Sequence, residues 1–214
     1  INRYALRLES AYKEIETSSA QLKEFSFKDE VTGLYNRRFF SIRLEEEVSR
    51  YRRFNHPVSV VLLDLDGFKE INDELGHAAG DETLRGMAEI LLRHSRGINV
   101  ICRYGGDEFM VILPETDLAG CEEVAGRIRA HLAERAVELA PGVGCTLSIG
   151  AADASRDTMS VDAWIQCADA ALYQAKAEGR DRCVGAIGRH PDGGRRRRRP
   201  GQAVLGQGPG TAVL

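Results

Sequence analysis

Hydrophobic residues follow two different spacings between residues 37 and 187 of this chain. Short apolar runs rich in β-branched residues predict buried strands, whereas apolar positions three and four residues apart predict amphipathic helices. Strands are predicted at 58–64, 100–102, 110–113, 145–151 and 183–187. Helices are predicted at about 37–54, from 69 to a break at Gly76-His77, and at 82–94, 118–136 and 161–177. Strands and helices therefore alternate through most of the chain.

The first 26 residues have another pattern, in which apolar residues alternate steps of three and four. This heptad spacing predicts a coiled coil and favours a parallel dimer. The alternative is a single amphipathic helix that packs on its own domain, because the seam is only about 3.5 heptads long. The seam positions are Ile1, Tyr4, Leu8, Ala11, Ile15, Ser18, Leu22 and Phe25.

The periodicity ends at Gly188, and glycine and proline become frequent. Five arginines run from Arg195 to Arg199. We expect a disordered tail over 188–214. A basic tract could contact nucleic acid or anionic lipid, but no aromatic or amphipathic pattern accompanies it, so a solvated tail without a defined partner is the simpler interpretation. The predicted organisation is a helix over 1–26, a domain over 27–187 and this tail.

Two adjacent carboxylates, Asp107 and Glu108, directly follow the glycine pair Gly105-Gly106. Apolar runs lie on both sides, which predicts a β-hairpin with acids at its tip. Glycine lacks a Cβ, so an anionic group such as a nucleotide phosphate could approach the backbone closely. Carboxylates would repel that phosphate, and a hard divalent cation with oxygen ligands would remove the conflict. The hairpin is therefore a candidate Mg²⁺-nucleotide site.

A second acidic element follows the apolar run 58–63, where the sequence reads Asp64-Leu65-Asp66-Gly67-Phe68-Lys69. Aspartates after a strand are commonly turn formers, and that alternative applies to this segment taken alone. Together with the hairpin, however, two carboxylate clusters on neighbouring strands could hold a metal ion between them. Lys69 could then offset the charge of a phosphate.

These residues carry a resemblance: the chain resembles the GGDEF-domain family, the diguanylate cyclases. The similarity extends over 27–187 and comprises six ordered motifs, which are 29–38, 64–73, 76–81, 105–109, 146–150 and 168–180. The resemblance implies an α+β fold whose βαββαβ core is like that of adenylyl cyclase and the polymerase palm. It also implies a mixed, mainly antiparallel sheet with the acids at its catalytic edge. An N-terminal coiled-coil helix commonly connects this domain to an upstream sensory or receiver domain, so a missing upstream regulator is implied.

Composition agrees with a cytoplasmic protein of one ordinary domain with extensions. The chain has 214 residues, of which 43% are hydrophobic and 29% charged, and a formal net charge of −3. That charge predicts no general attraction to nucleic acid. No apolar stretch is long enough to span a membrane. The five cysteines are widely spaced and odd in number, which predicts buried thiols in a reducing compartment. The chain begins at Ile1 without Met or a signal peptide, which we interpret as a fragment of a longer protein.

The resemblance implies a reaction in which the 3′-hydroxyl of one GTP attacks the α-phosphorus of another and expels pyrophosphate. Two rounds give cyclic di-GMP, and the enzyme acts as a homodimer with Mg²⁺, or Mn²⁺ in its place. It assigns catalysis to Asp107, Lys69 and Glu108. It assigns metal binding to the side chains of Asp64, Asp107 and Glu108 and to the Leu65 carbonyl.

Substrate contacts are also implied residue by residue. Asn72 and Asp81 correspond to the pair that reads guanine, and a carboxylate can accept both guanine N1–H and the 2-amino group, which adenine does not offer together. GTP rather than ATP is therefore expected. His77 either contacts the substrate or only holds its loop. The backbone contacts would come from the glycine pair, and the phosphate contacts from Arg103, Lys176 and Arg180.

One departure from the family pattern concerns regulation. Relatives inhibited by their product carry Arg-x-x-Asp before the glycine pair, whereas this chain has Arg96 and then Asn99. Arg127 matches a frequent secondary arginine. Because an amide lacks the charge of a carboxylate, we expect a weakened inhibitory site. Three functions remain open: an active cyclase, a catalytically silent module that senses GTP or cyclic di-GMP, and a dimerisation module.

Overall fold

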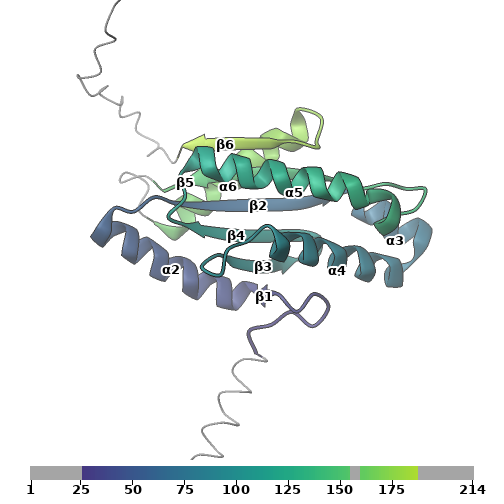
Figure 1. Cartoon of the computed structure of the whole chain (residues 1–214), viewed down its shortest axis with the longest axis horizontal. Coiled ribbons are helices and arrows are strands. Elements are labelled where there is room, and N and C mark those ends of the chain that lie inside the picture. The colour runs from purple at the N-terminus through teal and green to yellow at the C-terminus, as the bar shows by residue number, and fades with distance from the viewer. Residues whose placement is uncertain (1–25, 155–159, 188–214) are drawn as a thin grey trace, which may run out of the picture.

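The fold is a six-stranded sheet covered by helices on both faces (Figure 1). The computed structural model describes residues 26–154 and 160–187, and the predicted N-terminal coiled coil and C-terminal tail lie outside them, apart from Ser26. The strands are β1 (Tyr35–Asn36), β2 (Val58–Asp66), β3 (Val100–Gly105), β4 (Glu108–Pro114), β5 (Thr146–Asp153) and β6 (Cys183–Ile187). The helices are α2 (Arg37–Phe54), α3 (Phe68–Leu75), α4 (His77–Arg93), α5 (Leu118–Leu139) and α6 (Val161–Ala177).

The sheet order is β1-β3-β4-β2-β5-β6. Strands β3, β4, β2 and β5 pair antiparallel, whereas the outer pairs β1–β3 and β5–β6 are parallel. From β2 to β5 the chain runs strand, helices α3 and α4, hairpin, helix, strand. This is the predicted βαββαβ core with a mixed, mainly antiparallel sheet. The two-residue strand β1 was not predicted from the apolar pattern, because it is too short to show a periodicity.

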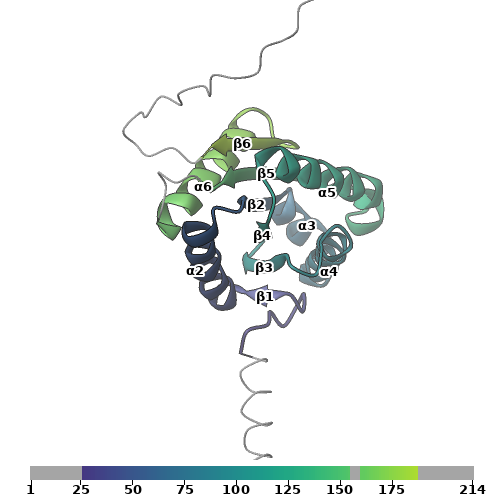
Figure 2. The same cartoon turned by 60° about the vertical axis from the view of Figure 1, so that its left-hand side comes forward.

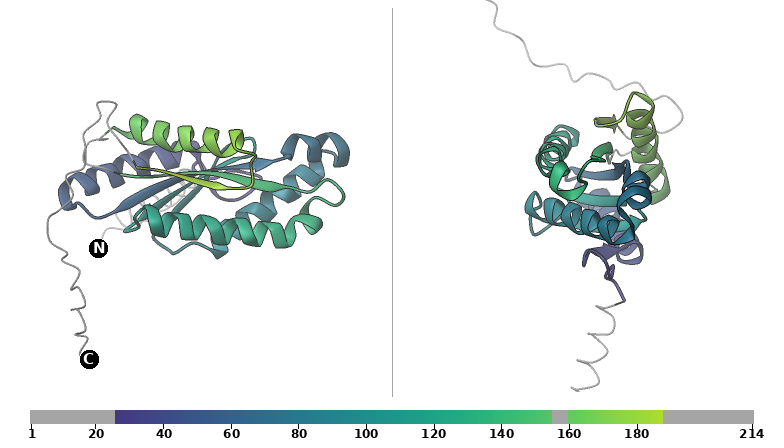
Figure 3. Two further views of the ribbon diagram at one scale, coloured as in Figure 1. Left: turned by 90° about the horizontal axis from the view of Figure 1, so that it is seen from above. Right: turned by 90° about the vertical axis from the view of Figure 1, so that its right-hand side faces the viewer.

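The molecule has three layers, which Figure 2 shows nearly end-on. Helices α4 and α5 cover one face and helices α2 and α6 the other, and α5 and α6 lie on opposite faces of the sheet in the left view of Figure 3. Each face has its own hydrophobic core: Leu84 and Met87 of α4 are buried in one, and Phe40 of α2 and Trp164 of α6 in the other. Alternate residues of the central strands face alternate cores, because successive side chains of a strand point to opposite sides.

Strand β2 lies in the interior of the sheet, and all nine of its residues are buried. Its apolar run explains this position, because a strand with both faces covered reads as continuously hydrophobic. The run ends with Asp64 and Asp66, which are two residues apart and therefore face the same side of the sheet. The fold thus places the predicted acids at the end of an interior strand.

Helix α4 begins earlier than predicted. We expected a helix from 82, but α4 starts at His77 and contains Gly80 and Asp81. Gly76 alone makes the corner between α3 and α4, with φ 85° and ψ 162°, and its carbonyl accepts hydrogen bonds from the amides of Ala79 and Gly80. Only glycine adopts this backbone conformation readily, so the helix can restart at the next residue.

The prediction that all five cysteines are buried is wrong for two of them. Cys102, Cys121 and Cys145 are buried, but Cys167 and Cys183 are only partly buried. Cys183 begins β6, the outermost strand on its side of the sheet, where neighbours cover only part of a side chain. All five are free thiols. No helix among the described residues has the length and apolar composition needed to cross a membrane.

Candidate active site

Three predicted carboxylates meet where β2 and the β3–β4 hairpin end. Asp64 of β2 lies directly opposite Glu108 of β4 in the antiparallel register. The turn that carries Asp107 is joined to β2 by a hydrogen bond from the Leu65 amide to the Asp107 carbonyl, at 3.3 Å. The structure therefore places the segments that carry the residues expected to bind metal next to one another. Asp64 is only 8% exposed, so its charge is poorly solvated and needs a partner.

These carboxylates influence one another's ionisation. Burial, and then the negative charge of Asp64, raise the pKa of Asp107 above its ordinary value. Burial also raises the pKa of Glu108, and the charges of Asp64 and Asp107 add to that effect. Like charges held close together disfavour full ionisation unless a cation is present. The cluster is thus a place where positive charge is favoured.

Lys176 supplies positive charge to this cluster in the structure. Its ammonium lies 2.7 Å from Asp64 Oδ2. Across residues 26–154 and 160–187, no three acidic, histidine or cysteine side chains are arranged as a metal site. The expected ligand atoms are nevertheless hard oxygen donors of the kind that Mg²⁺ prefers. The Lys176 ammonium thus balances the charge of Asp64, which a divalent cation held by the same carboxylate would also balance.

The second aspartate of β2 has a different environment. Asp66 accepts hydrogen bonds from the hydroxyls of Thr146 and Ser148 on β5, at 2.8 to 3.0 Å. Arg180 Nε lies 3.7 Å from the Asp66 carboxylate, although the Arg180 side chain is 63% exposed. The two cations expected to contact phosphate, Lys176 and Arg180, therefore both face carboxylates of β2. Their predicted phosphate contacts stay predictions.

The glycine pair forms the tip of the hairpin and borders open space. A Cβ placed on Gly105 or Gly106 would meet no atom within 4 Å, and Gly106 has φ +53°. The strand register shifts between Arg103 and Gly105, so the tip is irregular rather than a continued ladder. The backbone of the tip is therefore not covered on the side where a Cβ would lie, so an anionic group could approach it there.

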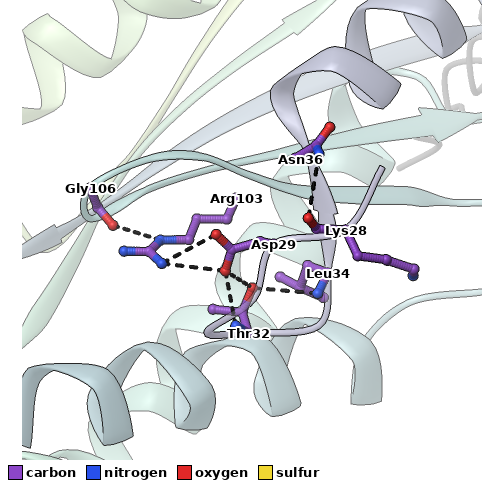
Figure 4. A network of polar contacts seen from close by, with 7 residues as sticks. All are labelled: Lys28, Asp29, Thr32, Leu34, Asn36, Arg103 and Gly106. Carbon is purple, nitrogen blue, oxygen red and sulfur yellow. Dashed lines mark hydrogen bonds and ion pairs between the residues drawn. The ribbon is translucent and has the colours of Figure 1, made fainter. Parts of the chain in front are cut away.

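Arg103 connects this tip to the segment that precedes β1, as Figure 4 shows. Its Nε donates to the Gly106 carbonyl at 2.9 Å, and its Nη1 lies 3.3 Å from both carboxylate oxygens of Asp29. Asp29 also accepts hydrogen bonds from the Thr32 amide and hydroxyl. Arg103 was expected to contact phosphate, but its guanidinium is directed at Asp29 and the hairpin backbone. The Asp29 contact was not predicted.

The residues expected to read guanine lie at the α3–α4 corner. Asn72 of α3 contacts His77 at the start of α4, with 3.2 Å between Asn72 Oδ1 and His77 Nδ1. Asp81 lies one turn further along α4, and Lys69 is exposed on the first turn of α3. In the part of the chain that the structure describes, neither Lys69 nor Asp81 makes a hydrogen bond or ion pair with the acidic cluster. The roles predicted for Lys69 and Asp81 therefore stay predictions.

Comparison with known proteins decides the family. Residues 26–182 match the family described as "Diguanylate cyclase, GGDEF domain". The chain belongs to the GGDEF-domain family. It is 42% identical over 165 residues to the response regulator PleD of Caulobacter vibrioides, an alignment that covers 76% of this chain and 36% of PleD. It is 36% identical over 187 residues to the diguanylate cyclase DosC of Escherichia coli, covering 84% of this chain and 40% of DosC.

Solved structures support the same family. The coiled coil and GGDEF domain of DgcB from Caulobacter crescentus, in complex with cyclic di-GMP, superposes with a TM-score of 0.78 and 27% identity, covering 86% of this chain and all of that one. The diguanylate cyclase SiaD of Pseudomonas aeruginosa, in complex with its activator SiaC, gives a TM-score of 0.71 and 35% identity over 86% of this chain and 71% of SiaD. The chain spans less than half the length of PleD and DosC.

A cavity of about 350 Å³ lies on this GGDEF domain between the end of α4 and the start of α5. Arg96, Asn99 and Arg127, the residues expected to form a weakened inhibitory site, all line it. The structure therefore brings these three together, although Arg127 comes from a distant part of the sequence. Acidic residues also line the cavity, among them Glu115 and Glu123. Its role as an inhibitory site stays a prediction.

Two features of this GGDEF domain were missed by sequence reasoning. One is the hydroxyl pair Thr146 and Ser148. These residues are two apart on β5 and pair with Asp66 and Asp64, so all four side chains share one face of the sheet, and the spacing could have been recognised. The other is Asp29, which lies 74 positions from its partner Arg103 and gives no local signal of that contact.

Proposed function

We propose that this chain is a diguanylate cyclase, which condenses two GTP molecules into cyclic di-GMP and releases two pyrophosphates. The observation that carries the proposal is the meeting of Asp64, Asp107 and Glu108 beside the open backbone of the hairpin tip. A sensor would need only to hold nucleotide, whereas mutually repelling carboxylates beside an open glycine backbone suit a reaction on a phosphate group. This arrangement supports the enzyme over the silent module.

Mg²⁺ is part of the proposal, with Mn²⁺ as an alternative. Asp64, Asp107, Glu108 and the Leu65 carbonyl would hold it. When bound, it would neutralise phosphate charge and lower the proton affinity of the attacking hydroxyl. The raised pKa values of Asp107 and Glu108 agree with such a role. Neighbouring carboxylates disfavour each other's ionised form, and a bound cation would offset that repulsion.

The remaining steps use side chains of the chain itself. In each of two rounds the 3′-oxygen of one GTP forms a bond to the α-phosphorus of the other, and the bond from that phosphorus to the pyrophosphate oxygen breaks. The hydroxyl proton would pass to a nearby carboxylate, and Asp107 is the residue proposed for this role because the family motif places it at the reacting phosphate. Lys176 would exchange Asp64 for phosphate oxygens, and Lys69 and Arg180 would add positive charge.

The product also determines the assembly. Each domain would hold one GTP, with Asn72 and Asp81 reading the guanine, so two copies must face each other for reaction. We therefore propose a homodimer. By the resemblance to the family we also propose a cytoplasmic location and control by an upstream sensory or receiver domain.

The test is incubation of the purified chain with GTP and MgCl₂ and detection of cyclic di-GMP by mass spectrometry. Asp107→Asn should lower product formation by about a hundredfold or more, as loss of a catalytic proton acceptor does. The matched control is Asp162→Asn, an exposed aspartate in the first turn of α6, which should leave the rate unchanged. Circular dichroism would show that both variants are folded.

Turnover of Asp107→Asn at the parent rate would refute the assignment of the catalytic carboxylate. Absence of product from the parent, with GTP or cyclic di-GMP still binding in calorimetry, would favour the silent module instead. Removal of divalent ions with EDTA should abolish product, and readdition of MgCl₂ should restore it.

A further inference from the structure

Gly80, in the first turns of α4, packs against a residue of the proposed guanine site. A Cβ built on Gly80 would lie 2.2 Å from Asn72 Oδ1 and 3.1 Å from Asn72 Cγ. The distance to Oδ1 is far shorter than any normal contact and the distance to Cγ is tight, and both atoms belong to the carboxamide that would read the base. The next nearest atom is Phe68 Cζ, at 3.3 Å.

The backbone gives no reason for glycine at this position. Gly80 lies inside α4, and its φ is not in the left-handed region that favours glycine. Glycine within a helix is less favourable than alanine, because it loses more backbone freedom on folding. The reason is therefore steric: the missing side chain leaves the space in which the Asn72 carboxamide lies.

The carboxamide is also oriented by two hydrogen bonds. Asn72 Nδ2 donates to the Phe68 carbonyl at 3.2 Å, within α3. Asn72 Oδ1 lies 3.2 Å from His77 Nδ1 and accepts from it in the tautomer that carries the proton there. One Nδ2 hydrogen is left over, and it can donate to an acceptor atom of a base. Turning the amide away from Gly80 would break both contacts.

The corner at Gly76 makes this packing possible. Because α4 restarts at His77, the side chain of His77 and the backbone of Gly80 both face Asn72 across the short α3–α4 turn. We propose that Gly80 is a positioning residue for nucleotide selectivity, which together with His77 holds the Asn72 carboxamide in the orientation that binds a guanine base. This inference rests on the proposed function of the α3–α4 corner.

The test is a double-mutant cycle between Gly80→Ala and Asn72→Ala. Gly80→Ala alone should weaken GTP binding about three- to tenfold, the effect of losing one well-placed hydrogen bond, and should lower the preference for GTP over ATP by a similar factor. In the Asn72→Ala background the added methyl no longer meets the carboxamide. Gly80→Ala should then change GTP binding by less than about twofold, so the two effects should be strongly non-additive.

Two other helical glycines serve as controls. A Cβ on Gly126 of α5 would meet nothing within 4 Å, so Gly126→Ala should leave binding and selectivity unchanged. A Cβ on Gly86 of α4 would lie 2.3 Å from Leu139 Cδ2 in the core, so Gly86→Ala should lower the unfolding midpoint but not the GTP preference. Urea unfolding of all variants separates the loss of stability from the loss of selectivity.

The readouts are the affinity for GTP and ATP by calorimetry, KM and kcat separately, and the side-chain amide signals of Asn72 in ¹⁵N spectra. A shift of those signals in Gly80→Ala, absent in Gly126→Ala, is expected. Unchanged amide signals and selectivity in Gly80→Ala would overturn the inference, as would a fully additive cycle. If the parent binds no GTP, the proposed function fails, and the amide signals alone decide whether Gly80 positions Asn72.

Discussion

The contact between Asp29 and Arg103 is the basis of a stability prediction. It joins the segment before β1 to the hairpin tip, and the two side chains are only 22% and 15% exposed. Burial opposes ionisation of Asp29, but the hydrogen bonds from Thr32 and the charge of Arg103 outweigh it and lower the pKa of Asp29. The substitution Asp29→Asn removes the charge and keeps the shape of the side chain.

The magnitude follows from the geometry. Two unit charges 3.3 Å apart interact by about 5 kcal/mol at an effective dielectric constant of about 20, before any desolvation cost is subtracted. Desolvation of both groups removes most of this, and charged hydrogen bonds retain about 1.5–3 kcal/mol. We expect Asp29→Asn to lower the free energy of unfolding by about 1–2 kcal/mol, because one Asn oxygen can still accept from Thr32.

The assay is urea unfolding at several pH values, with Glu82→Gln as the control. Glu82 pairs with Arg85, but the Glu82 side chain is 71% exposed. Its loss should therefore lower the free energy of unfolding by only about 0.3 kcal/mol. Because the folded pKa of Asp29 is lowered, its contribution is fully present above the unfolded pKa of about 3.9 and is lost as pH falls through the folded pKa. The difference in the free energy of unfolding between the parent and Asp29→Asn should therefore become smaller at acidic pH.

A difference below about 0.5 kcal/mol at pH 7 would place this pair with ordinary surface pairs and would refute the reasoning. A difference in the free energy of unfolding that does not shrink as the pH falls would also refute it, because the contribution of the ionised Asp29 is lost when the folded state is protonated. The double variant with Arg103→Met should show coupling of about 1 kcal/mol between the two sites.

Two further predictions concern selectivity and regulation. Asp81→Ser should relax the preference for GTP over ATP by about ten- to a hundredfold, measured as the ratio of kcat/KM values, because a charged partner for guanine is lost; an unchanged ratio would remove Asp81 from the site. Asn99→Asp should strengthen inhibition by added cyclic di-GMP about ten- to a hundredfold in initial-rate measurements, since it restores a charged acceptor in the cavity lined by Arg96 and Arg127; equally strong inhibition of parent and variant would show that Asn99 is an adequate substitute.

The sequence predicted the elements well where their patterns were long or strongly apolar. The interior strand β2 and helices α2 and α6 agree closely with the predicted ranges, because their apolar residues report burial directly. The predicted bounds of a helix were wrong where the backbone conformation of a single glycine decides where the helix begins. Gly76 restarts α4 at His77, five residues earlier than expected, and this places Gly80 and Asp81 on a helix rather than in a loop.

The sequence indicated which residues belong to the candidate site, but it did not indicate which of their side chains contact one another. The acids and glycines are consecutive in sequence, so their association at the hairpin tip follows from local pattern. The partners of the cations are not local: Lys176 reaches Asp64 on another element, and Arg103 reaches Asp29. Such pairings depend on how distant elements pack, and no spacing in the sequence records them.

Asp64 and Asp66 lie at the same strand end but have different surroundings, which bears on their proposed roles. Both residues are buried, each with 8% of its surface exposed. Asp66 is held by two donors on the neighbouring strand β5, the hydroxyls of Thr146 and Ser148, whose short side chains are anchored in the sheet directly opposite Asp66 and Asp64. Asp64 has a contact with the ammonium of Lys176, at the end of a flexible side chain that is 36% exposed.

A lysine can withdraw from such a pair at little structural cost, because its long side chain remains free to adopt other rotamers in water. Asp64 can therefore exchange its partner for another cation while Asp66 keeps the strand end in place. This asymmetry supports Asp64, and not Asp66, as the metal ligand of the proposed reaction. It also gives Lys176 a reason to lie at the acidic cluster before substrate arrives: it neutralises Asp64 there and is already positioned to meet a phosphate.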